Sequence, residues 1–177
     1  LKVLAAGKML SIQAHPNKEQ AKAGFKRENA KGVSINAKNR NYKDSNHKPE
    51  IIVAVNDFYV LNGFRPMEEI AKLLEDSEEL RDIMPDFRQR LNTAGKVEKN
   101  RKKLIKELYS KIMSEELMPQ ERVDKILKPL INRLRKQSFS KDEAEFWVLK
   151  ADEQYTKNGH IDRGIFSIYL LNLIHLR

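Results

Sequence analysis

Residues 58–74, FYVLNGFRPMEEIAKLL, change from one kind of secondary structure to another within a few positions. The first seven, FYVLNGF, are rich in aromatic and β-branched residues, which is typical of a strand. From Arg65 onward the apolar residues recur with a period of about 3.6, and Pro66 suits the first turn of a helix. The sequence therefore predicts two unlike parts, with strands and loops before this point and helices after it.

The second part continues with helical patterns. Apolar stripes predict helices near residues 99–118 and after Pro119, with a kink or break at Pro129. Ser140 and Glu143 match a capping box, which predicts a helix through about residue 158. Residues 164–176 are expected to begin as a helix and to finish as a strand. These stripes are typical of a helical core rather than of a cofactor site.

The first part carries short apolar runs separated by a long polar connection. LKVL (1–4), MLSIQAH (9–15) and EIIVAV (50–55) read as strands, the last because of its β-branched residues. Residues 17–49 are polar and rich in Asn and Lys. Asn17 could cap a helical turn at residues 18–23. A loop of this length is usually functional or mobile.

Composition narrows the class of protein. The 177 residues carry a formal charge of +9, and cysteine is absent, which excludes disulfides and thiolate metal sites. No apolar run is long enough to span a membrane, and the first residues lack the pattern of a signal peptide. We therefore expect a cytoplasmic protein without a membrane partner. The basic run at residues 99–103 contains no aromatic residue for base stacking, so we also expect no nucleic-acid partner.

Polar side chains that suit a metal ion occur on the two predicted strands. In strand alternation Gln13 and His15 face the same side as Ser11, and Glu50 opens the later strand. If the two strands are close, Gln13, His15 and Glu50 can converge on one cation. Imidazole and carboxylate groups suit zinc, and an amide oxygen can be a third donor. The alternative is that these residues form the solvent face of a sheet.

Three motifs, in this order and at these intervals, resemble the signature of type I phosphomannose isomerases. They are SIQAHPNK (11–18), NRNYKDSNHKPE (39–50) and VLNGFRP (60–66). The middle string is polar and idiosyncratic, so a chance match is improbable. DRGIFSIYLLNLIHL (162–176) also resembles the family segment in which a helix returns to the barrel. The resemblance covers essentially the whole chain.

The resemblance implies an α+β fold with part of a cupin-like (jelly-roll) β-barrel and an inserted α-helical domain. We expect two to four barrel strands and the long polar loop in residues 1–62, the helical insert in 63–163, and a return toward the barrel in 164–177. It also implies one zinc ion per active site, held by Gln13, His15, Glu50 and a later histidine.

The family interconverts mannose 6-phosphate and fructose 6-phosphate through an enediol. The resemblance favours Lys48 and His47 for acid–base work or ring opening. Ser11 could bind a sugar or phosphate oxygen, and Lys2 could supply positive charge near the phosphate. Tyr42 and Asp44 are expected to fix the loop that presents His47 and Lys48, with Asp44 accepting backbone hydrogen bonds there.

Both ends of the sequence lie within apolar segments, and we expect a piece of a longer protein. The fourth zinc ligand and an active-site arginine would then follow Arg177, and the fragment alone would be inactive. The alternative function is a non-catalytic helical binding or interaction module that retains some affinity for sugar phosphate or metal.

Overall fold

The computed structural model describes residues 3–177, and these form two compact units. The smaller unit is Ser11–Ala54. The larger unit contains the residues up to Leu10 together with Val55–Arg177. Each unit is described separately below.

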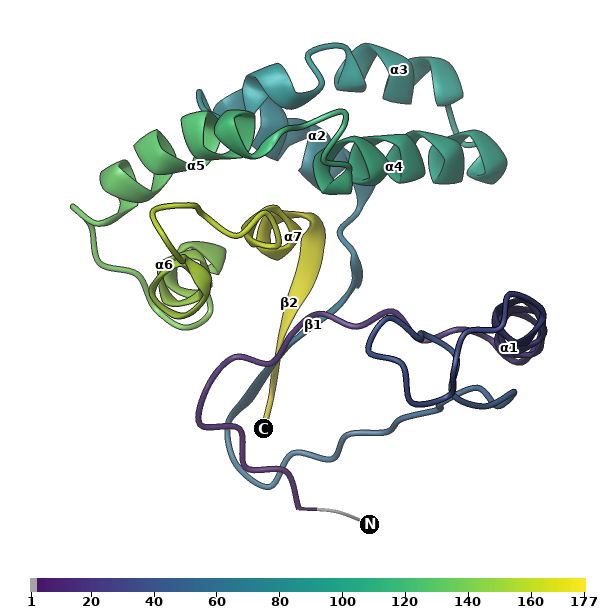
Figure 1. The fold of residues 1–177 in the computed structure, drawn as a ribbon. Helices are drawn as coiled ribbons and strands as arrows, with labels where there is room; N and C mark the ends of the chain where they lie inside the picture. Colours follow the sequence, from purple (N-terminus) through teal and green to yellow (C-terminus); the bar gives the residue numbers. More distant parts are fainter. Residues whose placement is uncertain (1–2) are drawn as a thin grey trace. The chain divides into compact units, whose positions relative to one another are not determined.

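The larger unit contains a two-stranded antiparallel sheet. Strand β1 (Phe58–Phe64) lies beside β2 (Leu171–Leu176) (Figure 1). In the register of this pair, Tyr59 lies opposite His175. The register shifts between Leu61 and Phe64, where Gly63 takes a φ of +67°. A residue with a side chain rarely adopts this φ, so glycine allows the irregularity at the end of the pairing. The strand predicted at residues 58–64 is confirmed, as is the change from helix to strand in 164–176.

Helices fill the sequence between the two strands. They are α2 (Met67–Asp76), the 3-10 helix η1 (Arg81–Ile83), α3 (Phe87–Ala94), α4 (Glu98–Met113), α5 (Gln120–Leu134), α6 (Ala144–Tyr155) and α7 (Ile165–Leu170). Figure 1 shows α7 running directly into β2. The sequence did not predict η1 or α3, and its predicted N-cap of α6, Ser140, lies three residues before the observed N-cap, Glu143.

Of the kink or break predicted at Pro129, the break is not formed, because α5 continues through this residue. Proline removes one backbone hydrogen bond from a helix interior. On either side of it Leu127, Leu130 and Ile131 are at most 2% exposed. Burial of these apolar side chains, each worth roughly 1.5–3 kcal/mol, offsets the missing bond.

One apolar core joins the helices of the larger unit. Its largest fully buried side chains come from every part of the helical sequence and include Ile70, Leu80, Phe87, Leu108, Leu127 and Phe166. The stripes predicted for α2, α4 and α5 are the faces that contribute to this core. Among the described residues, no helix is both long enough and apolar enough to cross a membrane.

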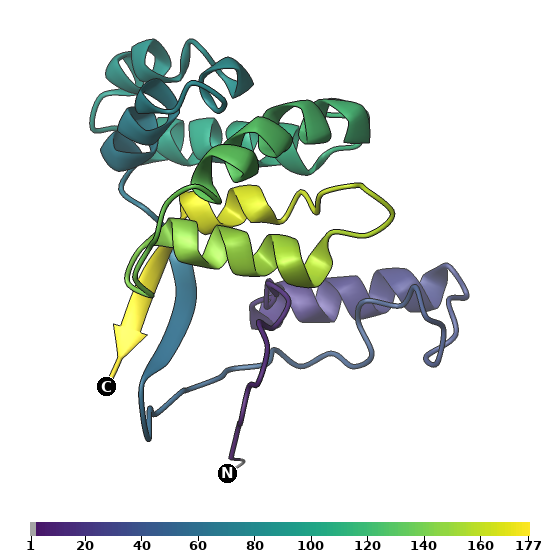
Figure 2. The same cartoon turned by 90° about the vertical axis from the view of Figure 1, so that its left-hand side faces the viewer.

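The smaller unit has one helix, α1 (Lys18–Ala30), followed by the long polar loop (Figure 2). Asn17 caps it with a complete capping box: its side chain accepts from Gln20 N–H, and the Gln20 side chain accepts from Asn17 N–H. The cap predicted at Asn17 is therefore confirmed, and the helix is longer than the single turn expected.

The strands expected at residues 9–15 and 50–55 are not formed within the described chain. Neither segment takes part in a helix or strand, and of LKVL only residues 3 and 4 are described, also outside any strand. A strand requires a hydrogen-bonded neighbour, and the only described sheet is the β1–β2 pair. The mixed α+β class is confirmed, whereas the described residues form no β-barrel.

Candidate metal centre

His15 and Glu50 lie beside each other in the smaller unit. His15 belongs to the segment that ends at Pro16 and enters the capped helix α1, and Glu50 follows Pro49 at the end of the polar loop. His15 Nδ1 is 3.8 Å from Glu50 Oε2. The side chains are 30% and 50% exposed, so both donors are accessible to an ion or a small molecule.

Lys48 contacts the other oxygen of the same carboxylate. Its Nζ lies 3.0 Å from Glu50 Oε1. The hydrogen bond from Lys48 lowers the pKa of Glu50, partial burial opposes this, and the charges of Lys48 and His15 lower it further. Glu50 is therefore ionised at neutral pH, which is the form that binds a metal ion.

The spacing of the two donors fits zinc. Ligand distances of about 2.0–2.2 Å in a tetrahedral site put donor atoms about 3.4 Å apart. The 3.8 Å between His15 Nδ1 and Glu50 Oε2 is therefore close to the separation that shared coordination requires. Described residues form no cluster of three His, Asp or Glu side chains able to hold a metal. A third donor from this chain would therefore be of another type, such as the amide of Gln13.

The other predicted site residues make no such contact. Gln13, Ser11 and His47 are exposed, and none has a hydrogen bond or ion pair within the described part of the chain. Lys2 lies outside the described residues. The structure thus brings together His15, Lys48 and Glu50, and it places Gln13 two positions before His15 on the same segment.

Polar contacts fix the loop that leads to Lys48 and Glu50. Asp44 Oδ1 accepts a hydrogen bond of 2.7 Å from Asn46 N–H, as predicted for this residue. Earlier in the loop, the Glu28 carboxylate accepts from the backbone of Asn41 and Tyr42. Sequence reasoning missed Glu28, because a single glutamate near the end of a helix carries no periodic signal.

The remaining histidines have structural partners in the larger unit. Both ring nitrogens of His175 face carboxylates, with Nε2 2.7 Å from Asp57 Oδ1 and Nδ1 3.1 Å from Asp142 Oδ1. Its ring stacks on Tyr59 at 4.1 Å between centroids. His160 Nδ1 lies 2.8 Å from Asp124 Oδ2. These contacts are typical of histidines with a structural role.

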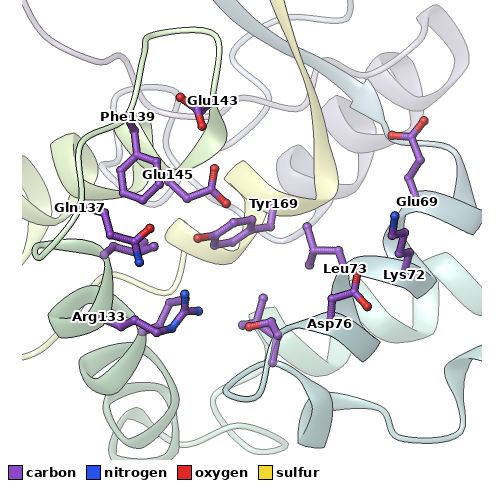
Figure 3. A pocket seen from close by; sticks show the side chains of 14 residues that line it. Glu69, Lys72, Leu73, Asp76, Arg133, Gln137, Phe139, Glu143, Glu145 and Tyr169 are labelled. Atoms are coloured by element: carbon purple, nitrogen blue, oxygen red, sulfur yellow. The ribbon is translucent and has the colours of Figure 1, made fainter.

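A groove of ≈ 520 Å³ lies within the larger unit, and none of the sequence-predicted site residues is among those that line it (Figure 3). Its walls come from α2, α5, α6, α7 and the segment before α6, and include Leu73, Asp76, Arg133, Gln137, Phe139 and Tyr169. Arg133 is engaged by Glu79 through two hydrogen bonds of 2.8 and 2.9 Å. The groove combines acidic and basic side chains and does not define one class of ligand.

Comparison with known proteins shows which class of enzymes the chain resembles. Residues 1–67 match the family model described as phosphomannose isomerase type I, catalytic domain. This range includes all the residues of the candidate metal centre. The chain is thus related to the type I phosphomannose isomerases through the region that carries His15, Lys48 and Glu50.

Individual relatives extend the match to the whole chain. It is 33% identical to mannose-6-phosphate isomerase of Escherichia coli and 32% identical to that of Salmonella typhimurium, over 99% of this chain and 40% of each relative. A crystal structure of the Salmonella typhimurium enzyme bound to fructose 6-phosphate and zinc matches 98% of this chain and 40% of that chain, with a TM-score of 0.71 and 31% identity. The chain is thus similar to type I phosphomannose isomerases over nearly its whole length, and it spans about 40% of the length of these relatives.

Proposed function

We propose that the chain is the central part of a mannose-6-phosphate isomerase, which interconverts mannose 6-phosphate and fructose 6-phosphate. The observation that carries the proposal is the placement of the Glu50 carboxylate between the His15 imidazole and the Lys48 ammonium group. These three groups lie in the part of the chain that matches the family's catalytic domain. Binding of fructose 6-phosphate and zinc by the Salmonella typhimurium relative supports the same substrate class and metal here.

Gln13, His15 and Glu50 would hold one zinc ion per active site. A bound zinc ion supplies Lewis acidity, which polarises substrate oxygens and makes the neighbouring C–H group more acidic. The 3.8 Å between the His15 and Glu50 donor atoms supports this assignment. Gln13 is assigned from the family motif and from its position on the same segment as His15.

Lys48 and His47 would move the proton between C1 and C2 by way of a cis-enediol, after ring opening. An amine and an imidazole can each act as acid and as base when they are close to the reacting carbons. The 3.0 Å contact to Glu50 holds Lys48 beside the proposed metal ligand, which supports its role. Ser11 would bind a sugar or phosphate oxygen, and Lys2 would face the phosphate. The charge of +9 suits an anionic substrate.

The exposed apolar residues before β1 support a larger β-structure around this site. Ile51, Val53 and Val55 are 89%, 79% and 96% exposed in the described chain. Such β-branched residues are typical of strands that bury at least one face. We propose that residues 1–62 contribute strands to a cupin-like barrel, that 63–163 are a helical insert, and that 164–177 return to the barrel. The strands that pair with them would come from the parts of the full-length protein that correspond to the unmatched parts of the relatives.

An isomerase assay on the full-length protein that contains this chain tests the proposal. Conversion of mannose 6-phosphate to fructose 6-phosphate should be measurable, should be abolished by a chelator and should return with added zinc. The 177-residue chain alone should be inactive, because it spans only about 40% of the length of the isomerases it matches and would hold zinc with Gln13, His15 and Glu50 alone. Zinc-loaded full-length protein without turnover would contradict the proposal and favour the non-catalytic binding module.

A further inference from the structure

A buried carboxylate joins α1 to the loop that carries the candidate metal centre. Glu28 is 8% exposed, and its Oε2 accepts a hydrogen bond of 2.9 Å from Tyr42 N–H. Its Oε1 accepts from Asn41 N–H at 3.2 Å and from the Asn41 side chain at 3.4 Å. The bond from Tyr42 N–H keeps the pKa of Glu28 below its usual range. One charged side chain thus satisfies two consecutive backbone donors of the loop.

Arg40 closes the same cluster from the loop side. It is 6% exposed, and its Nε donates to Tyr42 O at 2.7 Å. Its other nitrogens donate to Val33 O and, at 2.7 Å, to Asn29 Oδ1. Arg40 Nε also lies 3.7 Å from Glu28 Oε2. Buried charges are tolerated where they are paired and hydrogen-bonded, and both conditions hold here.

The Tyr42 ring lies directly on the backbone of α1. A Cβ atom added to Gly24 would be 2.5 Å from Tyr42 Cζ, closer than real Cβ contacts come. Only glycine at position 24 therefore allows this packing. The loop is fixed at Tyr42 from two sides, by the Glu28 carboxylate on its backbone and by α1 under its ring.

We propose that Glu28 is a positioning residue for the zinc and substrate site, an inference that rests on the proposed isomerase function. Beyond Tyr42, the described chain reaches Lys48 and Glu50 with no helix or strand and with only the Asp44 turn to direct it. Glu28 therefore determines where this stretch starts, and through it where Lys48 and Glu50 are presented. Glu28 itself does not touch metal or substrate.

Glu28→Gln in the full-length protein is the primary test. Glutamine keeps the size of the side chain but offers one acceptor oxygen where two are used, so one backbone N–H loses its partner. We expect zinc affinity, measured by competition with a chromophoric chelator, to fall about tenfold, together with kcat for mannose 6-phosphate. Glu19→Gln makes the same change of charge at an exposed position of α1 and should leave both unchanged.

A second pair of variants tests the same anchor without touching a charge. Gly24→Ala should displace the Tyr42 ring and lower zinc affinity and kcat. Tyr42→Ala removes the ring, so the double variant should be no worse than Tyr42→Ala alone. Gly7→Ala, at a glycine with no atom within 4 Å of an added Cβ, should have no effect.

The outcomes separate this inference from the proposed function. Wild-type protein that neither binds zinc nor converts mannose 6-phosphate would overturn both. An active wild type with unchanged zinc affinity and kcat in Glu28→Gln would overturn the positioning role alone. The positioning role would also be overturned if Glu28→Gln lowered only the fraction of folded protein and left zinc affinity and kcat per folded molecule normal. The carboxylate would then be merely structural.

Discussion

The two units of the chain differ in the polarity of the side chains that they bury. The larger unit buries large apolar side chains such as Phe87, Leu127 and Phe166 at 2% exposure or less. The buried residues of the smaller unit are Ala21, Gly24, Glu28 and Arg40, so its interior is small and largely polar. The larger unit is stabilised mainly by apolar burial. The smaller unit is stabilised mainly by hydrogen bonds that the Glu28 carboxylate accepts and that the Arg40 guanidinium donates.

The two kinds of interior suit two different tasks, stabilising the fold and positioning metal ligands. Apolar burial is non-directional and tolerates small shifts, which suits a core. Hydrogen bonds to a buried carboxylate fix backbone positions in a defined direction, which suits a loop that must present ligands. The candidate metal centre occurs in the polar unit. Five experiments test this contrast, the first four in order of expected effect and the last on the metal itself.

The largest effect is expected at Lys48. Lys48→Gln in the full-length protein should lower kcat by about 10²–10⁴-fold, because a proposed acid–base group is lost. Zinc content should stay near that of wild type, since the metal ligands remain. Lys38→Gln, at an exposed lysine of the same loop, is the matched control and should leave kcat unchanged. Normal kcat in Lys48→Gln would exclude this lysine from the chemistry.

Truncating an apolar side chain to alanine should lower the free energy of unfolding more in the larger unit than in the smaller one. Leu127→Ala, at a side chain that is 0% exposed, should lower the free energy of unfolding of the larger unit by about 2–5 kcal/mol. Val53→Ala, at 79% exposure, should change it by less than about 0.5 kcal/mol in the 177-residue chain. Denaturant unfolding followed by circular dichroism measures both.

The same Val53→Ala change sharpens the barrel proposal. If Val53 lies in a barrel strand of the full-length protein, the substitution should cost about 1–3 kcal/mol there, because the side chain would be buried. An equally small effect in both proteins would show that residues 50–55 remain uncovered, which contradicts the barrel proposal for this segment.

A smaller, pH-dependent effect on stability is expected from Glu79 in the larger unit. The hydrogen bonds from Arg133 lower the pKa of Glu79 to about 2, against burial that raises it. A lowered carboxyl pKa stabilises the fold above the unfolded value of about 4.5, and this contribution is lost as the pH falls toward 2. Because Arg133 is 49% exposed, we expect about 1–2 kcal/mol rather than the full shift.

Glu79→Gln should therefore destabilise the chain at pH 7 and have little effect at pH 2, as measured by thermal unfolding across this range. Glu78→Gln, at the exposed neighbouring position, is the control and should behave as wild type. An equal loss of stability at both pH values would contradict the assigned ion pair.

Secondary structure was predictable from the sequence where it depends on neighbouring residues. The cap at Asn17, the strand-to-helix change near Arg65 and the helix-to-strand change in 164–176 depend on neighbouring residues, and all are confirmed. The strands at 9–15 and 50–55 depend on distant hydrogen-bonded partners, which periodicity alone does not specify. Helix α3 was missed because FRQRLNTA has few apolar residues to mark a face.

The site was predictable to a similar degree. The motifs pointed to His15 and Glu50, and the structure brings these two side chains within 3.8 Å although they are far apart in sequence. The Glu28–Arg40 cluster was not predictable. Its contacts are side chain to backbone across a loop, and such contacts leave no pattern of residue types.

Zinc analysis of the full-length protein tests the central assignment most directly. Metal content measured by mass spectrometry should show one zinc ion per chain in the wild type. Glu50→Gln, which replaces a charged ligand by a neutral amide, should lose most of this zinc. Full zinc occupancy in Glu50→Gln would contradict the assignment of this carboxylate, and with it the metal centre proposed here.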